Sequence, residues 1–419
     1  MSALRYLEQR ARFGIKLGLR DVRRLLAALG HPERHCPVLL VAGTNGKGSV
    51  VAYTDAALRA AGLRVGRYTS PHLLRVNERI AVGGRDISTA ALERAIEHVR
   101  RAAQVLVEGG ALPAHPTHFE VLTAAAFLHF RRARVQVAVL EVGLGGRLDA
   151  TNVTAPAASA IVTVQRDHEQ HLGRTLGRIA AEKAGVLRRG RPTVVGPVAA
   201  VAHRVLERAA RARGARLVDA LAGVKVERRG GALDIHTPLG AWSGLRPLPG
   251  AHQETNLVVA VRLLEEARRR GLAFDNRRAA RGLSRARWPG RLQWIPGTPP
   301  LLLDGAHNPA AALALAGYLR TLGRPLVLLF GAMRDKRIAA MAAALFPLAR
   351  RVVLTSVDVA RAARPEEIAR RAGAAARGAL LEPDPARALG RARRLTPRGG
   401  VLVVAGSLYL VGEVLRRRK

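Results

Sequence analysis

The sequence is poor in cysteine and has no long uncharged apolar run. Cys36 is the single cysteine among 419 residues, which excludes a disulfide framework and suits a reducing compartment. The longest uncharged stretch, about 150–165, is broken by Asn, Thr and Pro and falls short of the roughly 20 apolar residues of a membrane span. Residues 1–14 lack the apolar run of a signal peptide. We therefore expect a cytoplasmic protein that does not bind membranes.

Acidic residues and lysines are also scarce, whereas arginine is abundant. The chain has 69 Lys and Arg against 31 Asp and Glu, a formal net charge of +38, and only six of the basic residues are lysines. Such an excess can attract nucleic acid non-specifically. The arginines are scattered, however, no nucleic-acid-binding motif occurs, and aromatic residues for base stacking make up only 4% of the chain. A coding sequence biased toward G and C explains the charge better than a specific nucleic-acid partner.

Short apolar runs alternate with longer helical stretches rich in Ala, Leu and Arg. The length suggests two or three domains of roughly 150 residues each. Nearly continuous apolar strands separated by helices predict an α/β fold with mostly parallel sheets covered on both faces. Strands are expected over residues 37–42, 64–69, 135–142, 160–164, 301–303, 325–330, 351–354 and 401–405.

Two stretches interrupt this alternation. Residues 217–235 indicate short antiparallel strands with a Gly230-Gly231 turn, and helices are expected next, over about 252–270 and 276–285. The Pro- and Gly-rich residues 287–300 predict a domain junction. We therefore expect an N-terminal domain over 1–288 and a smaller C-terminal α/β domain over 297–419.

A glycine-rich loop, GTNGKGS at Gly43–Ser49, follows the first expected strand and precedes a helix. Its glycines let backbone N–H groups converge on phosphate oxygens, the helix N-terminus adds partial positive charge, and Lys47 adds a full one. The spacing departs from G-x-x-x-x-G-K-[ST], and a simple strand-to-helix turn is the alternative. Because lysine is so rare here, its presence in the loop favours nucleotide binding.

Polar residues also stand at or just beyond the ends of other expected strands. Ser70 and His168 follow two of them, and Glu141 interrupts an apolar run. Ligands meet parallel sheets at the carboxyl ends of strands, and a carboxylate in a buried strand is costly unless it is paired or bound to metal. Glu141 is therefore interpreted as a Mg²⁺ ligand, with an arginine-paired core glutamate as the alternative. On spacing alone, Ser70 is better explained as a turn residue, and Lys183, on an expected helix over 175–187, as a surface lysine.

Seven segments occur together in order, in a pattern that extends from about residue 6 to residue 410. They are GTNGKGS, SPHLLRVNERI, THFEVLTAAAF, EVGLGGRLDATN, DH…EKAG, PGRLQ and DGAHNP. Together they resemble the folylpolyglutamate synthase/dihydrofolate synthase family of the Mur ligase superfamily. The resemblance implies a large N-terminal ATPase domain, a smaller C-terminal Rossmann-like domain and an active site between them.

The resemblance also implies roles for matching positions. ATP would be bound by Asn45, Gly46, Lys47, Gly48, Ser49, Asn256, Arg291 and Asp304. One Mg²⁺ would be held by Ser70 and Glu141 and a second by His168, and Lys183 would be carbamylated; Lys47, His168 and Lys183 would be catalytic. The pterin would be contacted by Gly14, Ile15, Lys16, Leu17, Thr117, His118, Phe119, Glu120, Leu148, Asp149 and Ala150.

Some of these positions have an equally good local explanation. Asp304 fits a strand-to-helix turn in which Asn308 caps the helix before Pro309, and Arg291 fits a solvated arginine. Lys336, in the matching segment GAMRDKRI, is assigned no chemistry.

The implied reaction is an ATP-dependent amide ligation by a monomer. A carboxylate of dihydropteroate or a reduced folate would be activated as an acyl phosphate and then attacked by the amine of L-glutamate. The products would be dihydrofolate and γ-linked polyglutamates, so both activities are expected in one protein. The alternatives are another Mur-type amino-acid ligase, which the THFE segment disfavours, and a phosphate-loop nucleic-acid-binding ATPase, which the net charge suggests.

Overall fold

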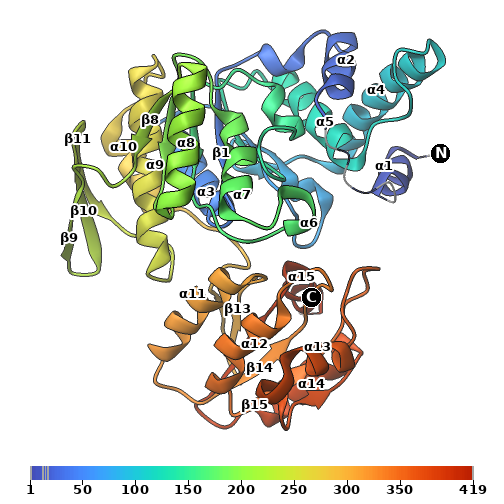
Figure 1. The fold of residues 1–419 in the computed structure, drawn as a ribbon, viewed down its shortest axis with the longest axis vertical. Helices are drawn as coiled ribbons and strands as arrows, with labels where there is room; N and C mark the ends of the chain where they lie inside the picture. Colours follow the sequence, from blue (N-terminus) through green and yellow to red (C-terminus); the bar gives the residue numbers. More distant parts are fainter. Residues whose placement is uncertain (1, 12–13, 15, 17, 418–419) are drawn as a thin grey trace.

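The computed structural model describes residues 2–11, 14, 16 and 18–417, and these form two α/β bodies (Figure 1). The N-terminal body contains the blue to yellow part of the chain, and the C-terminal body the orange to red part. The predicted α/β class with mostly parallel sheets is confirmed. Among the described residues, no helix combines the length and apolar character needed to cross a membrane.

Within residues 18–417, an eight-stranded sheet forms the centre of the N-terminal body, in the order β4-β3-β2-β5-β1-β6-β7-β8. Its pairs are parallel except for β3, which is antiparallel to both β2 and β4. The strands are β1 (Val38–Ala42), β2 (Val65–Tyr68), β3 (Ile80–Val82), β4 (Arg85–Asp86), β5 (Val137–Glu141), β6 (Ala158–Ile161), β7 (Pro192–Val195) and β8 (Arg216–Asp219).

Helices cover both faces of this sheet, so its central strands are buried throughout and consist of continuous apolar runs. Leu40 and Ala42 of β1 face one hydrophobic cluster, and Leu39 and Val41 face the other. The helices of this body are α1 (Ala3–Ala11), α2 (Arg20–Ala28), α3 (Lys47–Ala60), α4 (Thr89–Glu108), α5 (His118–Arg132), α6 (Glu169–Leu172), α7 (Leu176–Lys183), α8 (Ala200–Arg213), α9 (His252–Arg269) and α10 (Asn276–Ser284).

A three-stranded antiparallel ribbon of β9 (Lys225–Arg229), β10 (Ala232–Thr237) and β11 (Gly240–Leu245) lies beside α9 in the same described range (Figure 1). The predicted Gly230-Gly231 turn joins β9 to β10. The prediction that this region begins at Leu217 is wrong, because residues 216–219 form β8, which pairs in parallel with β7. Apolar alternation identifies a strand but not the direction of its neighbour.

The described part of the C-terminal body holds a six-stranded sheet in the order β12-β13-β17-β14-β15-β16, parallel except for β12. Its strands are β12 (Gln293–Ile295), β13 (Leu301–Leu303), β14 (Leu326–Phe330), β15 (Arg351–Leu354), β16 (Leu380–Leu381) and β17 (Val401–Ala405). Its helices are α11 (Pro309–Arg320), α12 (Ile338–Leu345), α13 (Pro365–Ala372), α14 (Pro385–Leu395) and α15 (Leu408–Arg416). Strand β12 lies inside the stretch predicted as the junction.

Short 3₁₀ helices complete the described elements: η1 (Pro32–Arg34), η2 (Val76–Arg79), η3 (Ala150–Val153), η4 (Ala184–Val186), η5 (Phe346–Leu348) and η6 (Gly373–Ala376). The helix expected over 175–187 ends as an α-helix at Lys183 and continues as η4. The expected strand over 160–164 is displaced and lies at Ala158–Ile161, because the chain beyond Ile161 turns toward the glycine-rich loop.

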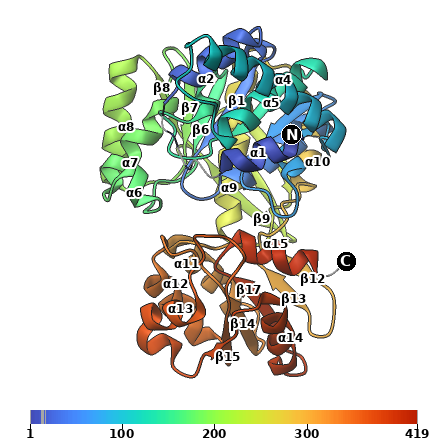
Figure 2. The ribbon, with the colours of Figure 1, turned by 90° about the vertical axis from the view of Figure 1, so that its right-hand side faces the viewer.

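The two bodies are in contact through α15 and the segment that follows β2. In Figures 1 and 2, α11 and α15 lie at the edge of the C-terminal body that faces the N-terminal body. A Cβ atom on Gly412 of α15 would lie 2.2 Å from the carbonyl oxygen of Leu73. The Leu73 side chain packs against a core cluster of the C-terminal body, so close packing joins the two bodies.

Candidate active site

A cavity of about 1060 Å³ lies between the two bodies. The N-terminal body lines it with the glycine-rich loop, the ends of β2 and β5, and Lys183. The C-terminal body contributes residues that follow β13, β14 and β17, among them Asp304, Lys336 and Ser407. The carboxyl ends of parallel strands from both sheets thus open into one space, the usual place for ligands in α/β folds.

The glycine-rich loop passes from β1 into α3. Gly46 has a φ of +84°, and a Cβ atom there would lie 2.5 Å from Asn256 Oδ1, so only glycine fits. The backbone N–H of Asn45 donates to Thr163 Oγ1 at 2.9 Å, and that hydroxyl donates to the Asn45 carbonyl at 3.0 Å. Lys47 Nζ donates to the Thr44 carbonyl at 3.2 Å. The loop is therefore held in shape by its neighbours and presents its lysine to the cavity.

Helix α9 and the chain before β12 support the other side of this loop. Gln253 Nε2 donates to Ser49 Oγ at 3.1 Å, and Asn256 Nδ2 donates to Gln253 Oε1 at 3.0 Å. The Trp288 ring packs on Gly48 so closely that a Cβ atom there would lie 2.6 Å from it. The predicted nucleotide residues Ser49 and Asn256 are thus brought together from positions about 200 residues apart in sequence.

Glu141 ends β5 as a buried carboxylate, with 5% of its surface exposed. Its Oε2 accepts a hydrogen bond from the Ser70 backbone N–H at 3.2 Å. Burial raises the pKa of Glu141, and the positive charge of Lys47 opposes that rise. No arginine among the described residues forms an ion pair with it, so the alternative of an arginine-paired core glutamate is wrong.

A divalent cation fits the donor set at this place. Glu141 and the Ser70 hydroxyl offer hard oxygen ligands, and a bound cation would relieve the cost of burying the carboxylate. Among the described residues, no group of three or more His, Cys, Asp or Glu side chains is arranged to hold a metal ion. This sparse set suits Mg²⁺, which uses one or two carboxylates, several waters and substrate phosphates.

Lys183 is at the end of α7, 2% exposed, and lines the cavity. The interpretation of Lys183 as a surface lysine is therefore wrong. Burial lowers the pKa of its amine to about 7, and the charge on Lys47 adds to the effect. No carboxylate among the described residues lies within 4.0 Å of its Nζ. A substantial fraction of this amine is therefore uncharged at neutral pH and able to react as a nucleophile.

Two glycine contacts place the Lys183 helix against the loop after β5. A Cβ atom on Gly185 would lie 2.1 Å from Arg147 Cα, and one on Gly146 would lie 3.0 Å from the Glu182 carbonyl oxygen. Arg147 also forms an ion pair with Glu182 at 2.8 Å. The glycines of EVGLGGRLD and EKAG thus permit the close approach that directs Lys183 into the cavity.

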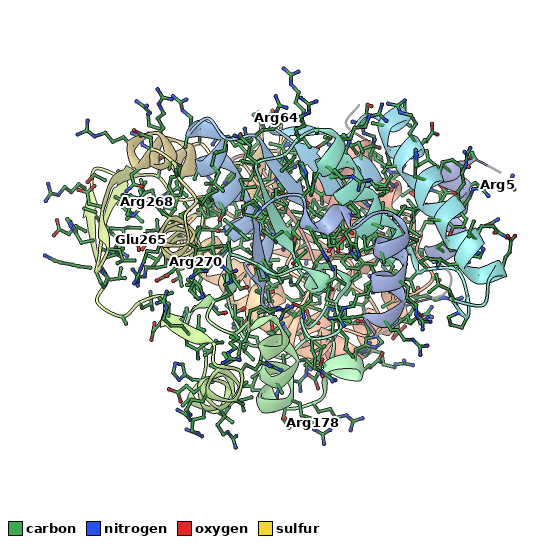
Figure 3. All side chains as sticks on the ribbon, turned by 90° about the horizontal axis from the view of Figure 1, so that it is seen from above. Arg5, Arg64, Arg178, Glu265, Arg268 and Arg270 are labelled. Carbon is green, nitrogen blue, oxygen red and sulfur yellow. The ribbon has the colours of Figure 1, made fainter. Side chains whose placement is uncertain are left out.

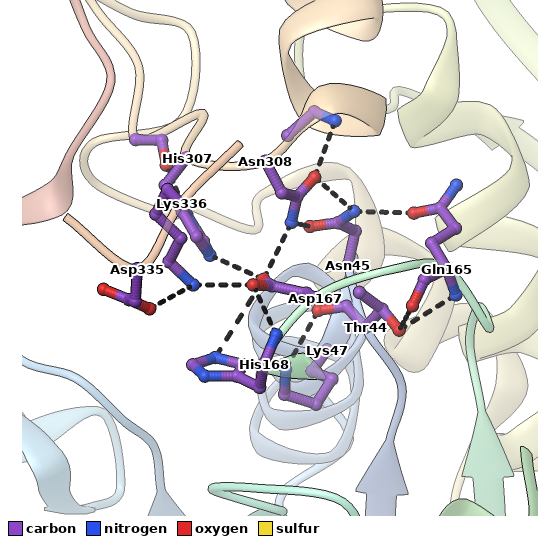
Figure 4. A network of polar contacts seen from close by, with 12 residues as sticks. Thr44, Asn45, Lys47, Gln165, Asp167, His168, His307, Asn308, Asp335 and Lys336 are labelled. Carbon is purple, nitrogen blue, oxygen red and sulfur yellow. Dashed lines mark hydrogen bonds and ion pairs between the residues drawn. The ribbon is translucent and has the colours of Figure 1, made fainter. Parts of the chain in front are cut away.

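Asp167 is the centre of a polar network between the two bodies (Figure 4). Its Oδ1 accepts from Lys336 Nζ at 2.6 Å, and its Oδ2 accepts from Asn308 Nδ2 at 3.0 Å. His307 Nε2 lies 3.4 Å from the same Oδ2. Burial alone would raise the pKa of this carboxyl, but His307, His168 and Lys336 outweigh it and hold the pKa far below its usual range. Asp167 is therefore ionised and joins the two bodies.

Asn45 extends this network to the glycine-rich loop. Its Nδ2 donates to Gln165 Oε1 at 2.6 Å, and it exchanges hydrogen bonds with Asn308 at 2.9 and 3.1 Å. His168 follows Asp167, and burial lowers the pKa of its imidazole to about 4. His168 is therefore neutral at pH 7, the form that binds a metal ion.

Asp304 both stabilises the turn after β13 and lines the cavity. Its two carboxylate oxygens accept backbone hydrogen bonds from Leu292 at 2.9 Å and Ala306 at 2.8 Å, and the residue lines the cavity together with Arg291. Asn308 caps α11 by accepting from the Ala311 N–H at 3.0 Å, as predicted.

The predicted pterin segments line the same cavity on the side formed by the N-terminal body. Glu120 closes a capping box at the start of α5, with Oε2 accepting from the backbone N–H and the hydroxyl of Thr117, both at 2.8 Å. The cavity lining includes Gly14, Lys16, Thr117, His118, Phe119, Glu120, Leu148, Asp149 and Ala150. Lys16 forms an ion pair with Asp21, and Ile15 and Leu17 lie outside the described residues.

Comparison with known proteins shows which family the chain belongs to. Residues 290–408 match the family model described as Mur ligase, glutamate ligase domain. The dihydrofolate synthase/folylpolyglutamate synthase of Bacillus subtilis is 33% identical over 428 residues, an alignment that covers 99% of this chain and 98% of that protein. The chain belongs to the folylpolyglutamate synthase/dihydrofolate synthase family.

Other members of the family differ in length or have known structures. A probable bifunctional folylpolyglutamate synthase/dihydropteroate synthase of Haloferax volcanii is 38% identical over 98% of this chain, which spans about half (49%) of that longer protein. A solved bifunctional folylpolyglutamate synthase/dihydrofolate synthase, with Mn, AMPPNP and L-glutamate bound, is 30% identical with a TM-score of 0.88. The match covers 100% of this chain and 98% of that one.

Sequence reasoning missed the C-terminal half of the polar network. The sequence indicates no chemistry for Lys336, yet this residue is 6% exposed and paired with Asp167. For His307 and Asn308 the sequence predicts only a strand-to-helix turn. The scarcity of lysine, which favours a functional role for Lys47, applies equally to Lys336 and is the signal in the sequence that could have found it.

Proposed function

We propose that this protein is an ATP-dependent ligase that joins L-glutamate to dihydropteroate and to the γ-carboxylate of reduced folates. One observation carries the proposal: the glycine-rich loop, Glu141 and the buried amine of Lys183 face a single cavity that the C-terminal body closes. The full-length similarity to a dihydrofolate synthase/folylpolyglutamate synthase supports it.

ATP binds across the two bodies in this proposal. Asn45, Gly46, Lys47, Gly48 and Ser49 hold its phosphates, with Asn256, Arg291 and Asp304 completing the nucleotide site. The loop N–H groups and the Lys47 amine neutralise charge that develops on the transferred phosphoryl group. The predicted segments around Phe119 and Asp149 hold the pterin.

Two divalent cations complete the proposed site. Ser70 and Glu141 hold one, and His168 holds the other, since a buried carboxylate and a neutral imidazole are suitable donors. When bound, the cations neutralise phosphate charge during transfer.

Lys183 carries a carbamate in this proposal. Its uncharged amine attacks CO₂, a C–N bond forms, and one proton is released to water, which converts a buried amine into an anion. The lowered pKa supports this reaction because only the neutral amine is nucleophilic. The anion would balance the charges of Lys47 and the cations.

The reaction proceeds through an acyl phosphate. A carboxylate oxygen of the pteroate or folate attacks the γ-phosphorus of ATP, and ADP leaves. The amine of glutamate then attacks the acyl carbon, loses a proton and expels inorganic phosphate. Closure of the two bodies around the bound substrates would keep out water, which would otherwise hydrolyse the intermediate. We further propose that the protein acts as a monomer in the cytoplasm.

Phosphate release with each substrate omitted in turn tests this function. Release is expected only with ATP, Mg²⁺, glutamate, and dihydropteroate or a reduced folate together. If no pteroate or folate stimulates release in the presence of glutamate, the proposal is overturned. Replacing glutamate by other amino acids tests the alternative of another Mur-type ligase.

The net charge supplies a second arm of this test. Exposed arginines, including Arg5, Arg64, Arg178, Arg268 and Arg270, project from several sides of the molecule (Figure 3). A charge spread in this way gives weak, salt-sensitive attraction to polyanions. Stimulation of ATP hydrolysis by DNA or RNA, lost steeply with salt, would instead favour the nucleic-acid-binding ATPase.

A further inference from the structure

Arg79 is a buried guanidinium without a carboxylate partner. It ends η2, is 9% exposed and lines the cavity. Its Nε donates to His72 Nδ1 at 2.9 Å. No carboxylate oxygen of an Asp or Glu among the described residues lies within 4.0 Å of the guanidinium nitrogens. Within the same residues, the Arg79 side chain forms no hydrogen bond other than the one to His72. Buried arginines are normally paired, because an unpaired buried charge costs several kcal/mol.

Glu78, which precedes Arg79 in the chain, does not supply the missing anion. The carboxylate of Glu78 is occupied by the backbone N–H groups of Leu73, Leu74 and Arg75 at 2.8–2.9 Å. The cavity histidines His72 and His118 cannot supply it either, because an imidazole side chain is neutral or positively charged. His72 accepts from Arg79, so its proton is on Nε2.

The position of Arg79 in the cavity indicates which ligand anion it meets. His118 and Phe119 begin α5, where the pterin segment is expected, and Ser70 and Glu141 mark the expected cation site. Arg79 lines the same cavity and interacts electrostatically with both His118 and Glu141, so it lies near both places. In the proposed reaction, the group that must lie there is the carboxylate of the acceptor.

We propose that Arg79 binds the carboxylate of the pteroate or folate acceptor and holds it for attack on ATP. The inference rests on the proposed function. Its Nη1 and Nη2 groups can donate parallel hydrogen bonds to the two carboxylate oxygens, a geometry that lysine cannot reproduce. His72 holds the guanidinium through Nε at 2.9 Å and leaves these two groups free of other side-chain acceptors among the described residues.

Comparison of an acid with its neutral amide tests this contact. Binding of dihydropteroate and of its carboxamide is measured by calorimetry, without nucleotide, on the full-length protein and on Arg79→Gln. The wild-type protein should prefer the acid by about 10- to 100-fold, the range of hydrogen bonds to a charged group. Arg79→Gln should bind both ligands alike, with its affinity for the amide close to that of the wild-type protein.

Arg85→Gln is the matched control, since it removes an exposed arginine from the adjacent hairpin and should keep the wild-type preference. Unchanged ADP affinity checks the fold of Arg79→Gln; if that variant does not fold, Arg79→Lys replaces it, with the preference expected to fall at least several-fold. If the variant prefers the acid as strongly as the wild-type protein does, the proposal is overturned, whatever the affinity for ADP. If the wild-type protein binds neither acid nor folate, the proposed function itself fails.

Discussion

Four of the six lysines line the cavity: Lys16, Lys47, Lys183 and Lys336. Lys225 is exposed on β9, and Lys419 lies outside the described residues. Guanidinium can replace an amine at most surface positions, but it stays charged and does not act as a nucleophile. The cavity is where a compact or uncharged amine is needed, so a chain rich in arginine keeps its lysines there.

Lys183→Ala is expected to lose ligase activity by about 100-fold or more, because the proposed carbamate anion is removed from the site of charge development. Acetate should restore part of the activity by occupying the vacated space. The control is Lys225→Ala, which changes an exposed lysine and should leave activity unchanged. A ¹³C NMR carbamate signal from protein incubated with labelled bicarbonate checks the modification directly, and its absence would contradict it.

The half-buried His118 should make stability depend on pH. Its folded pKa, about 3, is below the ordinary value of 6.5, so the unfolded chain binds the proton first as the pH falls. Its contribution is therefore fully present above pH 6.5 and is lost as the pH falls from about 6.5 toward 3. Urea unfolding at pH 7.5 and pH 5 should show a smaller loss of stability in His118→Gln than in the wild-type protein. If both proteins lose the same stability between pH 7.5 and pH 5, His118 is not a source of the pH dependence.

At the scale of elements, replacing each of two nearby glycines by alanine is expected to change the stability of the protein in opposite directions. Gly185→Ala places a Cβ atom 2.1 Å from backbone of the loop after β5, so we expect a loss of about 1–3 kcal/mol of stability and displacement of Lys183. Gly177→Ala, within α7, places its Cβ atom 3.8 Å from the nearest atom and should stabilise the helix by about 0.5–1 kcal/mol. Thermal unfolding of both variants checks the pair, and a similar effect of the two would contradict the packing argument.

Most elements could be predicted from the sequence because buried parallel strands are continuous apolar runs. The strands at 301–303, 351–354 and 401–405 have the predicted bounds, and the helices beginning at His252 and Asn276 end within one residue of prediction. The antiparallel pairing predicted for the residues of β8 is wrong, because the direction of pairing depends on the crossover helix α8 rather than on the strand's own residues. The local capping of α11 by Asn308 was predictable, since a cap is read from adjacent residues.

At the scale of the whole molecule, the site depends on pairs that are far apart in sequence. Asp167 and Lys336 are separated by 169 residues, and Asn45 and Asn308 by 263. The sequence around each of these residues does not indicate which distant residue it contacts. The resemblance to a family placed most cavity residues on the N-terminal side, but the polar network between the bodies required the structure.

The buried pair between the bodies should matter more than an exposed pair beside it. Lys336→Met removes a contact of 6% exposed side chains, whereas Arg337→Met removes an ion pair to Glu169 whose arginine is 53% exposed. We expect Lys336→Met to weaken the interface by up to about 3 kcal/mol and Arg337→Met by less than about 1 kcal/mol. Hydrogen exchange of amides in Gly43–Lys47 and in the first turn of α11 checks this. Equal acceleration in both variants would contradict it.

The Trp288 ring on Gly48 has a spectroscopic consequence. The chain has three tryptophans, and the other two do not line the cavity: Trp242 is buried with its indole N–H donating to Glu265, and Trp294 donates to Tyr318. An indole packed on the glycine-rich loop beside Lys47 changes its emission when phosphates replace water there. The molecule thus contains its own fluorophore at the nucleotide site, so the arrival of ATP and the release of ADP can be timed by stopped flow in the unlabelled protein.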